Sequence, residues 1–234
     1  MRTIKVRSKG DLMKAVYTEE EYRALAKVLE KHPQIYILSD EIYEHINYGT
    51  PNFSFAAIES MYDRTITVNG VAKAFAMTGW RIGYAAGPKD IIKAISKIQS
   101  QSTTNPSSIS QAAAVEALSG TQDFIKERAT SFQERRDFVV KALNEIDGIE
   151  CLNPDGAFYV FPSCKGLMGK KDSNGNELKT DTDFVQSLLE NSGIAVVQGS
   201  AFGLEGFFRI SYATSMDNLK KALEKISTFC KNLK

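Results

Sequence analysis

The sequence predicts an α/β fold in which a mostly parallel sheet is followed by a smaller α+β unit. The apolar run Ile35–Ser39 has little of the polar alternation of a half-exposed strand, Arg64–Val68 is interpreted as a second buried strand, and helical patterns flank them. After Gly148 the pattern changes to short strands separated by two helices. A chain of 234 residues with 43% hydrophobic residues is long enough to bury a core in one large domain or two small ones.

The first helix is predicted to begin at a capping box. Thr18 and Glu21 have the Thr-x-x-Glu spacing, and apolar residues then recur at helical spacing up to about Lys31. The strand Ile35–Ser39 follows, and Asp40 stands at its carboxyl end.

Two more buried strands are predicted in this part, Arg64–Val68 and Arg81–Ala86, and the second ends at Gly87-Pro88. Helices are expected at about 89–100, 107–119 and 122–146, with a proline near one start and glycines just past two ends. We interpret the charged residues of the last helix as a solvated face; they include Glu127, Arg128, Glu134, Arg135 and Arg136.

The part after Gly148 is predicted to hold three strands and two helices. The strands are Phe158–Phe161, Ile194–Val197 and Phe208–Tyr212, and the helices cover about 182–192 and 215–231. The polar segment 169–177 is predicted to be an exposed hairpin-like loop, with its turn at Asn174-Gly175.

Composition narrows the class of protein. Lys and Arg total 29 against 28 for Asp and Glu, so no net field favours nucleic acid or an anionic membrane. The cysteines Cys151, Cys164 and Cys230 are odd in number and widely spaced, which favours a reducing compartment and hence the cytoplasm. The two histidines make a zinc site unexpected, and no run reaches the roughly 20 apolar residues of a membrane span.

The segment Thr67–Tyr84 carries the main chemical signal. Lys73 lies among Val71, Ala72, Ala74 and Phe75, which would partly desolvate its amine and favour the neutral form that Schiff-base chemistry needs. Arg81 follows closely and could bind a phosphate. The alternative for Lys73 is a surface lysine beside a buried run.

These positions are predicted to converge, because ligands of open α/β sheets gather at the carboxyl ends of the strands. Three segments then carry a family resemblance: Ser39-Asp40-Glu41-Ile42-Tyr43-Glu44-His45, the lysine segment through Tyr84, and Phe208-Arg209-Ile210-Ser211-Tyr212-Ala213. Together they resemble the class I aminotransferases of pyridoxal-phosphate fold type I, in particular the bacterial aspartate aminotransferases. The resemblance runs from about Ala15 to the C-terminus and implies pyridoxal 5'-phosphate as the cofactor.

The resemblance implies a role for each of five residues. Lys73 would hold the cofactor covalently and move the proton of the substrate Cα, and Asp40 would lie against the pyridine nitrogen. Tyr43 would donate to the phenolic oxygen, Arg81 would pair with the phosphate, and Arg209 would hold the substrate carboxylate. The alternatives are a turn residue for Asp40, packing for Tyr43, and ordinary ion pairs with the chain's own acids for both arginines.

The chain also departs from the family pattern. Many relatives have Ser-x-Ser-Lys where this chain has Gly70-Val71-Ala72-Lys73, and Gly10–Lys14 stands where relatives have an Asn-Pro-Thr-Gly turn. The resemblance implies that the first part of the large domain, with its phosphate-binding helix end and stacking ring, is missing. We therefore divide the chain into a leader 1–14, a partial cofactor-binding large domain 15–147 and a small domain 148–234.

Transamination between an amino acid, expected to be aspartate or glutamate, and a 2-oxo acid by a ping-pong route is the function that the resemblance implies. Prephenate and aromatic substrates stay open. A homodimer is expected if the missing part is present. The alternative functions are a noncatalytic, truncated fragment of such an enzyme or an interaction module.

Overall fold

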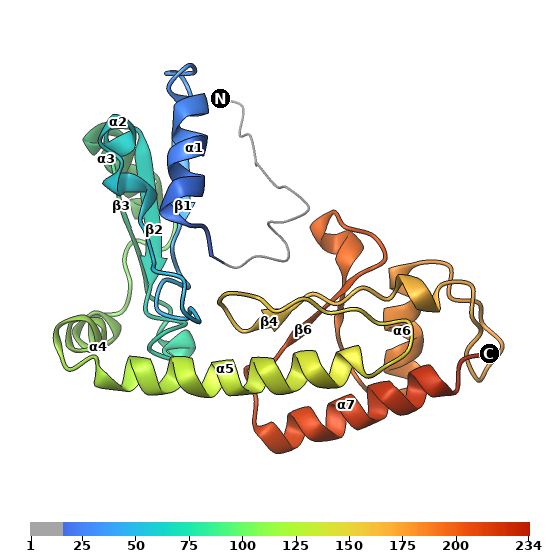
Figure 1. Ribbon diagram of the computed structural model, residues 1–234. Helices are drawn as coiled ribbons and strands as arrows, with labels where there is room; N and C mark the ends of the chain where they lie inside the picture. Colours follow the sequence, from blue (N-terminus) through green and yellow to red (C-terminus); the bar gives the residue numbers. More distant parts are fainter. Residues whose placement is uncertain (1–15) are drawn as a thin grey trace. The chain divides into compact units, whose positions relative to one another are not determined.

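The structure is a computed structural model, and it describes residues 16–234 (Figure 1). The described chain forms two compact units that divide inside helix α5 (Asp123–Asn144). We call Val16–Ala129 the first unit and Thr130–Lys234 the second unit. The predicted leader 1–14 lies outside the described residues, and the predicted domain boundary at residue 148 stays a prediction.

The first unit contains one sheet with the strand order β1-β2-β3, formed by β1 (Ile37–Asp40), β2 (Thr65–Gly70) and β3 (Gly83–Ala86). β1 and β2 are parallel, whereas β2 and β3 are antiparallel. A parallel pair needs a long crossover, but the connection 71–82 holds only the short 3-10 helix η2 (Thr78–Trp80). The described sheet is therefore half parallel, where the sequence predicted a mostly parallel one.

Four helices of the first unit follow the predicted ranges closely. They are α1 (Glu19–Leu29), α3 (Lys89–Ser100), α4 (Ser108–Ser119) and the first part of α5. The short helix α2 (Glu59–Tyr62) was not predicted. The capping box of α1 is confirmed. Thr18 Oγ1 accepts a hydrogen bond from the Glu21 amide at 3.2 Å, and Glu21 Oε2 accepts one from the Thr18 amide at 2.9 Å.

Of the strands predicted to be buried, β1 is exposed in part and β3 throughout, and this corrects the sequence interpretation. Leu38 in β1 is 67% exposed, and all four residues of β3 are exposed. β1 and β3 are the two outer strands of the described sheet, whereas the middle strand β2 is buried at both ends. Apolar runs thus identified the strands but not their order, and order decides which strand is covered on both sides.

The second unit has an antiparallel sheet with the strand order β4-β6-β5. Its strands are β4 (Tyr159–Val160), β5 (Val197–Gln198) and β6 (Phe208–Ser211), and its helices are α6 (Asp181–Ser192) and α7 (Met216–Lys231) together with the end of α5. The predicted elements are confirmed here. The one shift is in β5, which begins at the last residue of its predicted range.

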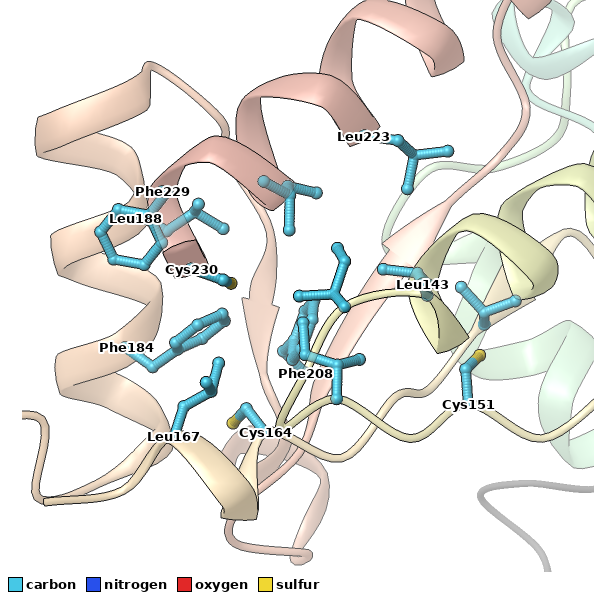
Figure 2. Close-up of a cluster of buried hydrophobic side chains, with 14 of the residues drawn as sticks. Leu143, Cys151, Cys164, Leu167, Phe184, Leu188, Phe208, Leu223, Phe229 and Cys230 are labelled. Carbon is cyan, nitrogen blue, oxygen red and sulfur yellow. The ribbon is translucent and has the colours of Figure 1, made fainter. Parts of the chain in front are cut away.

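A continuous hydrophobic core holds the second unit together (Figure 2). Phe184 of α6 is fully buried, and its ring centroid lies 4.9 Å from that of Phe208 and 5.9 Å from that of Phe229. The three cysteines are buried in the same core as free thiols. Burial raises the pKa of each thiol to about 12, and no pair forms a disulfide within residues 16–234.

The predicted loop 169–177 is a closed hairpin. Lys171 pairs with Glu177, and Gly175 has a φ of 85° and donates its amide to the Asp172 carbonyl at 3.0 Å. The Asp172 carboxylate accepts hydrogen bonds from Ser187 Oγ at 2.7 Å and from the Asn174 and Asn176 amides, each at 2.9 Å. The Ser187 bond is the main reason that the pKa of Asp172 lies below its usual value.

None of the helices within residues 16–234 has the length and apolar character that a membrane-spanning helix requires. In the same residues, no three His, Cys, Asp or Glu side chains come together as a possible metal site.

Candidate active site

Four of the five predicted site residues lie at one end of the first unit's sheet, where β1 and β2 end. Asp40 ends β1 and pairs with Val68, and β2 ends at Gly70, three residues before Lys73. β3 runs antiparallel and starts opposite Gly70, so Arg81 also lies at the carboxyl end of β2. Tyr43 follows Asp40 by three residues. The register thus places the four residues at one end of the sheet.

Lys73 lies on a tightly folded loop whose apolar side chains are buried. Val71 is fully buried, Ala74 is 5% exposed and Phe75 is 9% exposed, whereas Lys73 itself is half-buried. The Met77 amide donates to the Val71 carbonyl at 3.3 Å, which closes the loop on itself. The apolar neighbourhood predicted for the lysine is present. Its Nζ lies 5.8 Å from the centroid of the Tyr43 ring.

Asp40 begins a segment that is fixed by hydrogen bonds. The Glu41 amide donates to the Val68 carbonyl at 2.9 Å, and the Glu41 carboxylate accepts from Ser39 Oγ at 3.0 Å and Ser54 Oγ at 2.7 Å. Asp40 is exposed, and its Oδ1 accepts from the Ile42 amide at 3.3 Å. The turn contact that the sequence left as an alternative is therefore present, and it engages one of the two carboxylate oxygens.

Two residues near Lys73 adopt the left-handed backbone region. Ala76 has a φ of 53° and Arg81 a φ of 55°, and neither is a glycine. Arg81 is exposed and donates from Nη1 to the Thr78 carbonyl at 3.1 Å. Such conformations cost about 1–3 kcal/mol each and persist where the surroundings impose them, often at functional sites.

Gly70 ends β2, leads into the lysine loop and pairs with Gly83 of β3. A Cβ atom at this position would lie 2.9 Å from the Ile82 carbonyl oxygen and 3.1 Å from the Gly83 Cα. Both neighbours are backbone atoms, so rotation of a side chain cannot relieve the contact. The close approach of the two strands therefore requires glycine here.

Arg128 contacts the lysine loop, although the sequence analysis placed it on a solvated face. Its Nη1 donates to the Ala74 carbonyl at 2.9 Å, and its guanidinium lies 5.0 Å from the centroid of the Phe124 ring. Arg136 likewise donates to the Pro154 carbonyl, at 3.0 Å. Arg128 is exposed, as the solvated-face prediction has it, whereas the Arg136 side chain is only 11% exposed and corrects that prediction. A charge pattern cannot show which backbone carbonyls a helix will meet.

Arg209 lies in the second unit, on the middle strand β6. It is half-buried, and among residues 16–234 no acidic side chain lies within ion-pair distance of its guanidinium. The alternative of an ordinary ion pair with the chain's own acids is therefore not realised in the described residues. Two aromatic rings lie beside the guanidinium instead, at 4.5 Å for Tyr159 and 4.4 Å for Phe202. Sequence analysis did not identify either ring.

Comparison with protein families gives a match over most of the chain. The model of the family "Aminotransferase class I and II" matches residues 15–226, which include all five predicted site residues. The chain belongs to the class I and II aminotransferase family. The predicted resemblance is thereby confirmed.

Individual aminotransferases are highly similar to this chain. It is 57% identical over 221 residues to the aspartate aminotransferase of Rhizobium meliloti (strain 1021), covering 94% of this chain and 54% of the relative. It is 52% identical to the aspartate/prephenate aminotransferase of Cereibacter sphaeroides, covering 94% of this chain and 55% of that relative.

Solved aminotransferase structures place the chain in the same α/β fold class. The crystal structure of the Rhizobium meliloti aspartate aminotransferase has a TM-score of 0.91 at 55% identity, over 94% of this chain and 56% of that chain. An aromatic aminotransferase from Pyrococcus horikoshii has a TM-score of 0.81 at 38% identity, over 92% and 56% of the two chains. This chain thus spans about half the length of the relatives that it matches.

Proposed function

We propose that the chain carries the lysine-bearing part of a pyridoxal-phosphate-dependent aminotransferase together with its substrate-carboxylate unit. The observation that carries the proposal is the loop of Lys73. Within a chain that belongs to the aminotransferase family, this loop holds a half-buried amine beside Tyr43 at the carboxyl end of β2.

The residues at the carboxyl end of β2 fit the chemical groups of pyridoxal 5'-phosphate. The cofactor has an aldehyde, a ring nitrogen, a phenolic oxygen and a phosphate. In the same order, this end of the sheet offers the amine of Lys73, the carboxylate of Asp40, the phenol of Tyr43 and the guanidinium of Arg81. Asp40 has a second carboxylate oxygen beyond the one that meets Ile42. The loop before Lys73 offers no hydroxyl from Val71 or Ala72, so Arg81 is the phosphate ligand that this segment supplies.

When bound, pyridoxal phosphate supplies the electron-withdrawing ring that stabilises negative charge on the substrate Cα. Lys73 Nζ would hold the aldehyde carbon, and once released it would move the proton between the substrate Cα and the cofactor C4′. The Asp40 carboxylate would keep a proton on the ring nitrogen, and the Tyr43 hydroxyl would donate to the phenolic oxygen. Arg81 binds the phosphate, and Arg209 orients the substrate through its carboxylate.

The proposed substrates are an amino acid and a 2-oxo acid that use the same residues in turn, which is a ping-pong exchange. Aspartate or glutamate is the proposed amino acid, supported by the names of the relatives above. The names aspartate/prephenate and aromatic aminotransferase keep prephenate and aromatic substrates within the proposal. Identities of 50% and more to named aminotransferases favour this function over a noncatalytic fragment or an interaction module.

We also propose that additional polypeptide contributes to the cofactor site. By the resemblance, the phosphate-binding helix end and the stacking ring come from a part that precedes the position matching Ala15. The apolar surface of the first unit supports this, because β3 is exposed throughout and Ile98 of α3 is 72% exposed. We propose that the completed protein is a homodimer that works in the cytoplasm, where free thiols such as those of the second unit persist.

Borohydride reduction after incubation with pyridoxal phosphate tests the lysine assignment. We expect one reduced cofactor per chain on Lys73, no adduct in Lys73→Ala, and full labelling in Lys93→Ala, which removes a lysine of α3 in the same unit. Parallel samples contain the N-terminal part of a relative, mixed with or joined to the chain. Labelling that appears only there means that the cofactor site needs the added polypeptide, whereas labelling of another lysine in both samples contradicts the assignment.

A further inference from the structure

Arg209 is enclosed between two aromatic rings that come from opposite sides of its strand. Tyr159 belongs to β4, and Phe202 ends the 3-10 helix η4 (Gly199–Phe202), which follows β5. The guanidinium carbon lies 4.5 Å from the centroid of the Tyr159 ring and 4.4 Å from that of the Phe202 ring. Both distances are well within the roughly 6 Å of a cation–π contact.

The register of the sheet explains why Tyr159 reaches Arg209. Tyr159 is paired with Ser211 in antiparallel register, so Arg209, two residues earlier in β6, is its diagonal neighbour on the same face. The neighbouring positions of β6 point the other way, because Phe208 is fully buried in the core and Ile210 packs against it. Arg209 and Tyr159 therefore share the face that is turned away from this core.

Each ring is supported by a further aromatic residue. Phe158 lies beside Tyr159, with ring centroids 4.7 Å apart, and Phe161 meets Phe202 edge-on, with centroids 5.9 Å apart. The two rings are half-buried, and each contacts both its aromatic neighbour and the Arg209 guanidinium.

We propose that Tyr159 and Phe202 are positioning residues that hold the Arg209 plane ready for a carboxylate before any ligand arrives. A cation–π contact with the two rings uses none of the guanidinium N–H groups to bond an oxygen, so these donors stay available for a bidentate carboxylate. Because the rotamer entropy of the arginine is already lost, ligand binding does not bear that cost. This inference rests on the carboxylate role proposed for Arg209 above.

Side-chain NMR of the 15N-labelled chain tests the proposal without any transamination. The Arg209 Nε–H resonance is identified by its loss in Arg209→Met, and its order parameter is measured without ligand. We expect a rigid value near 0.85 in the native chain, in Tyr159→Phe and in Phe202→Tyr, which keep the rings. Tyr159→Leu and Phe202→Leu remove one ring each, and the value should fall below about 0.6.

Titration with succinate, a dicarboxylate that cannot be transaminated, gives the functional readout. The two leucine variants should bind it about 3- to 10-fold more weakly, which corresponds to part of the rotamer entropy of an arginine side chain. The matched control is Phe138→Leu, because Phe138 of α5 is a half-buried aromatic residue of the same unit that packs against the hydrophobic core. It should leave both readouts unchanged, and backbone spectra verify the fold of every variant.

The possible outcomes separate this inference from the proposed function. If Arg209→Met abolishes succinate binding but the leucine variants keep native rigidity and affinity, the positioning role alone is overturned. If Arg209→Met binds succinate as well as the native chain does, the carboxylate role of Arg209 is wrong and the positioning role falls with it. Loss in the leucine variants together with retention in Tyr159→Phe and Phe202→Tyr supports the proposal.

Discussion

A single methyl group added at Gly70 tests whether the lysine loop depends on close backbone contact with β3. The new Cβ in Gly70→Ala would lie 2.9 Å from the Ile82 carbonyl oxygen and 3.1 Å from the Gly83 Cα, and neither atom can rotate away. The strands must separate by a few tenths of an ångström. We expect a loss of about 1–3 kcal/mol in the free energy of unfolding, as for other overpacked sites.

Gly79→Ala is the matched control, because it makes the same chemical change a few residues away. A Cβ at Gly79 meets no atom within 4 Å, and its φ is not in the left-handed range. Alanine there should stabilise the chain by about 0.4–1 kcal/mol, since it restricts the unfolded state. The two substitutions should therefore shift stability in opposite directions.

The assay is urea unfolding followed by tryptophan fluorescence. Trp80 is the only tryptophan in the sequence and belongs to η2, between the lysine loop and β3, so its signal reports on this site. Borohydride labelling of Lys73 should fall in Gly70→Ala and persist in Gly79→Ala. An unfolding midpoint in Gly70→Ala at or above the native value would refute the close-contact argument.

Three further predictions concern the core of the second unit. Phe184→Ala should lower the stability measured by hydrogen exchange of the β6 amides by about 3–5 kcal/mol, because the ring is fully buried. Leu189→Ala, on the exposed face of α6, should lower it by less than about 1 kcal/mol. Equal losses would contradict the assigned core. The three buried thiols, with pKa values raised from 9.0 to about 12, should resist a thiol reagent at pH 8 until the chain unfolds. Since their folded pKa values are raised, their contribution to stability is complete below about pH 9 and is lost as the pH rises towards 12, which urea midpoints at several pH values would measure.

Local signals in the sequence predicted the helices well. The capping box at Thr18 and the apolar spacing that follows it depend on neighbours within one or two turns, and the structure contains both contacts. The same holds for the turn at Gly175, whose positive φ suits glycine. Such features need no knowledge of distant segments.

Features that depend on which segments meet were not predictable in the same way. The apolar run of β1 suggested full burial, but Leu38 is exposed because strand order puts β1 at the side of the described sheet. The contact of Arg128 with the Ala74 carbonyl joins residues far apart in the sequence, and so does the stacking of Tyr159 and Phe202 on Arg209. Single-sequence periodicity carries no information on such pairs.

The two arginines assigned to anions differ in how far this chain alone prepares them. Arg81 is exposed, keeps an unfavourable backbone conformation and donates to the carbonyl of Thr78, so its phosphate role depends on what else surrounds the phosphate. Arg209 lies in a paired strand with a ring on each side, and the described residues provide that whole arrangement. A preorganised donor binds without further ordering of the chain. Carboxylate binding at Arg209 should therefore be measurable in the 234-residue chain without cofactor, even if cofactor binding at Lys73 needs additional polypeptide.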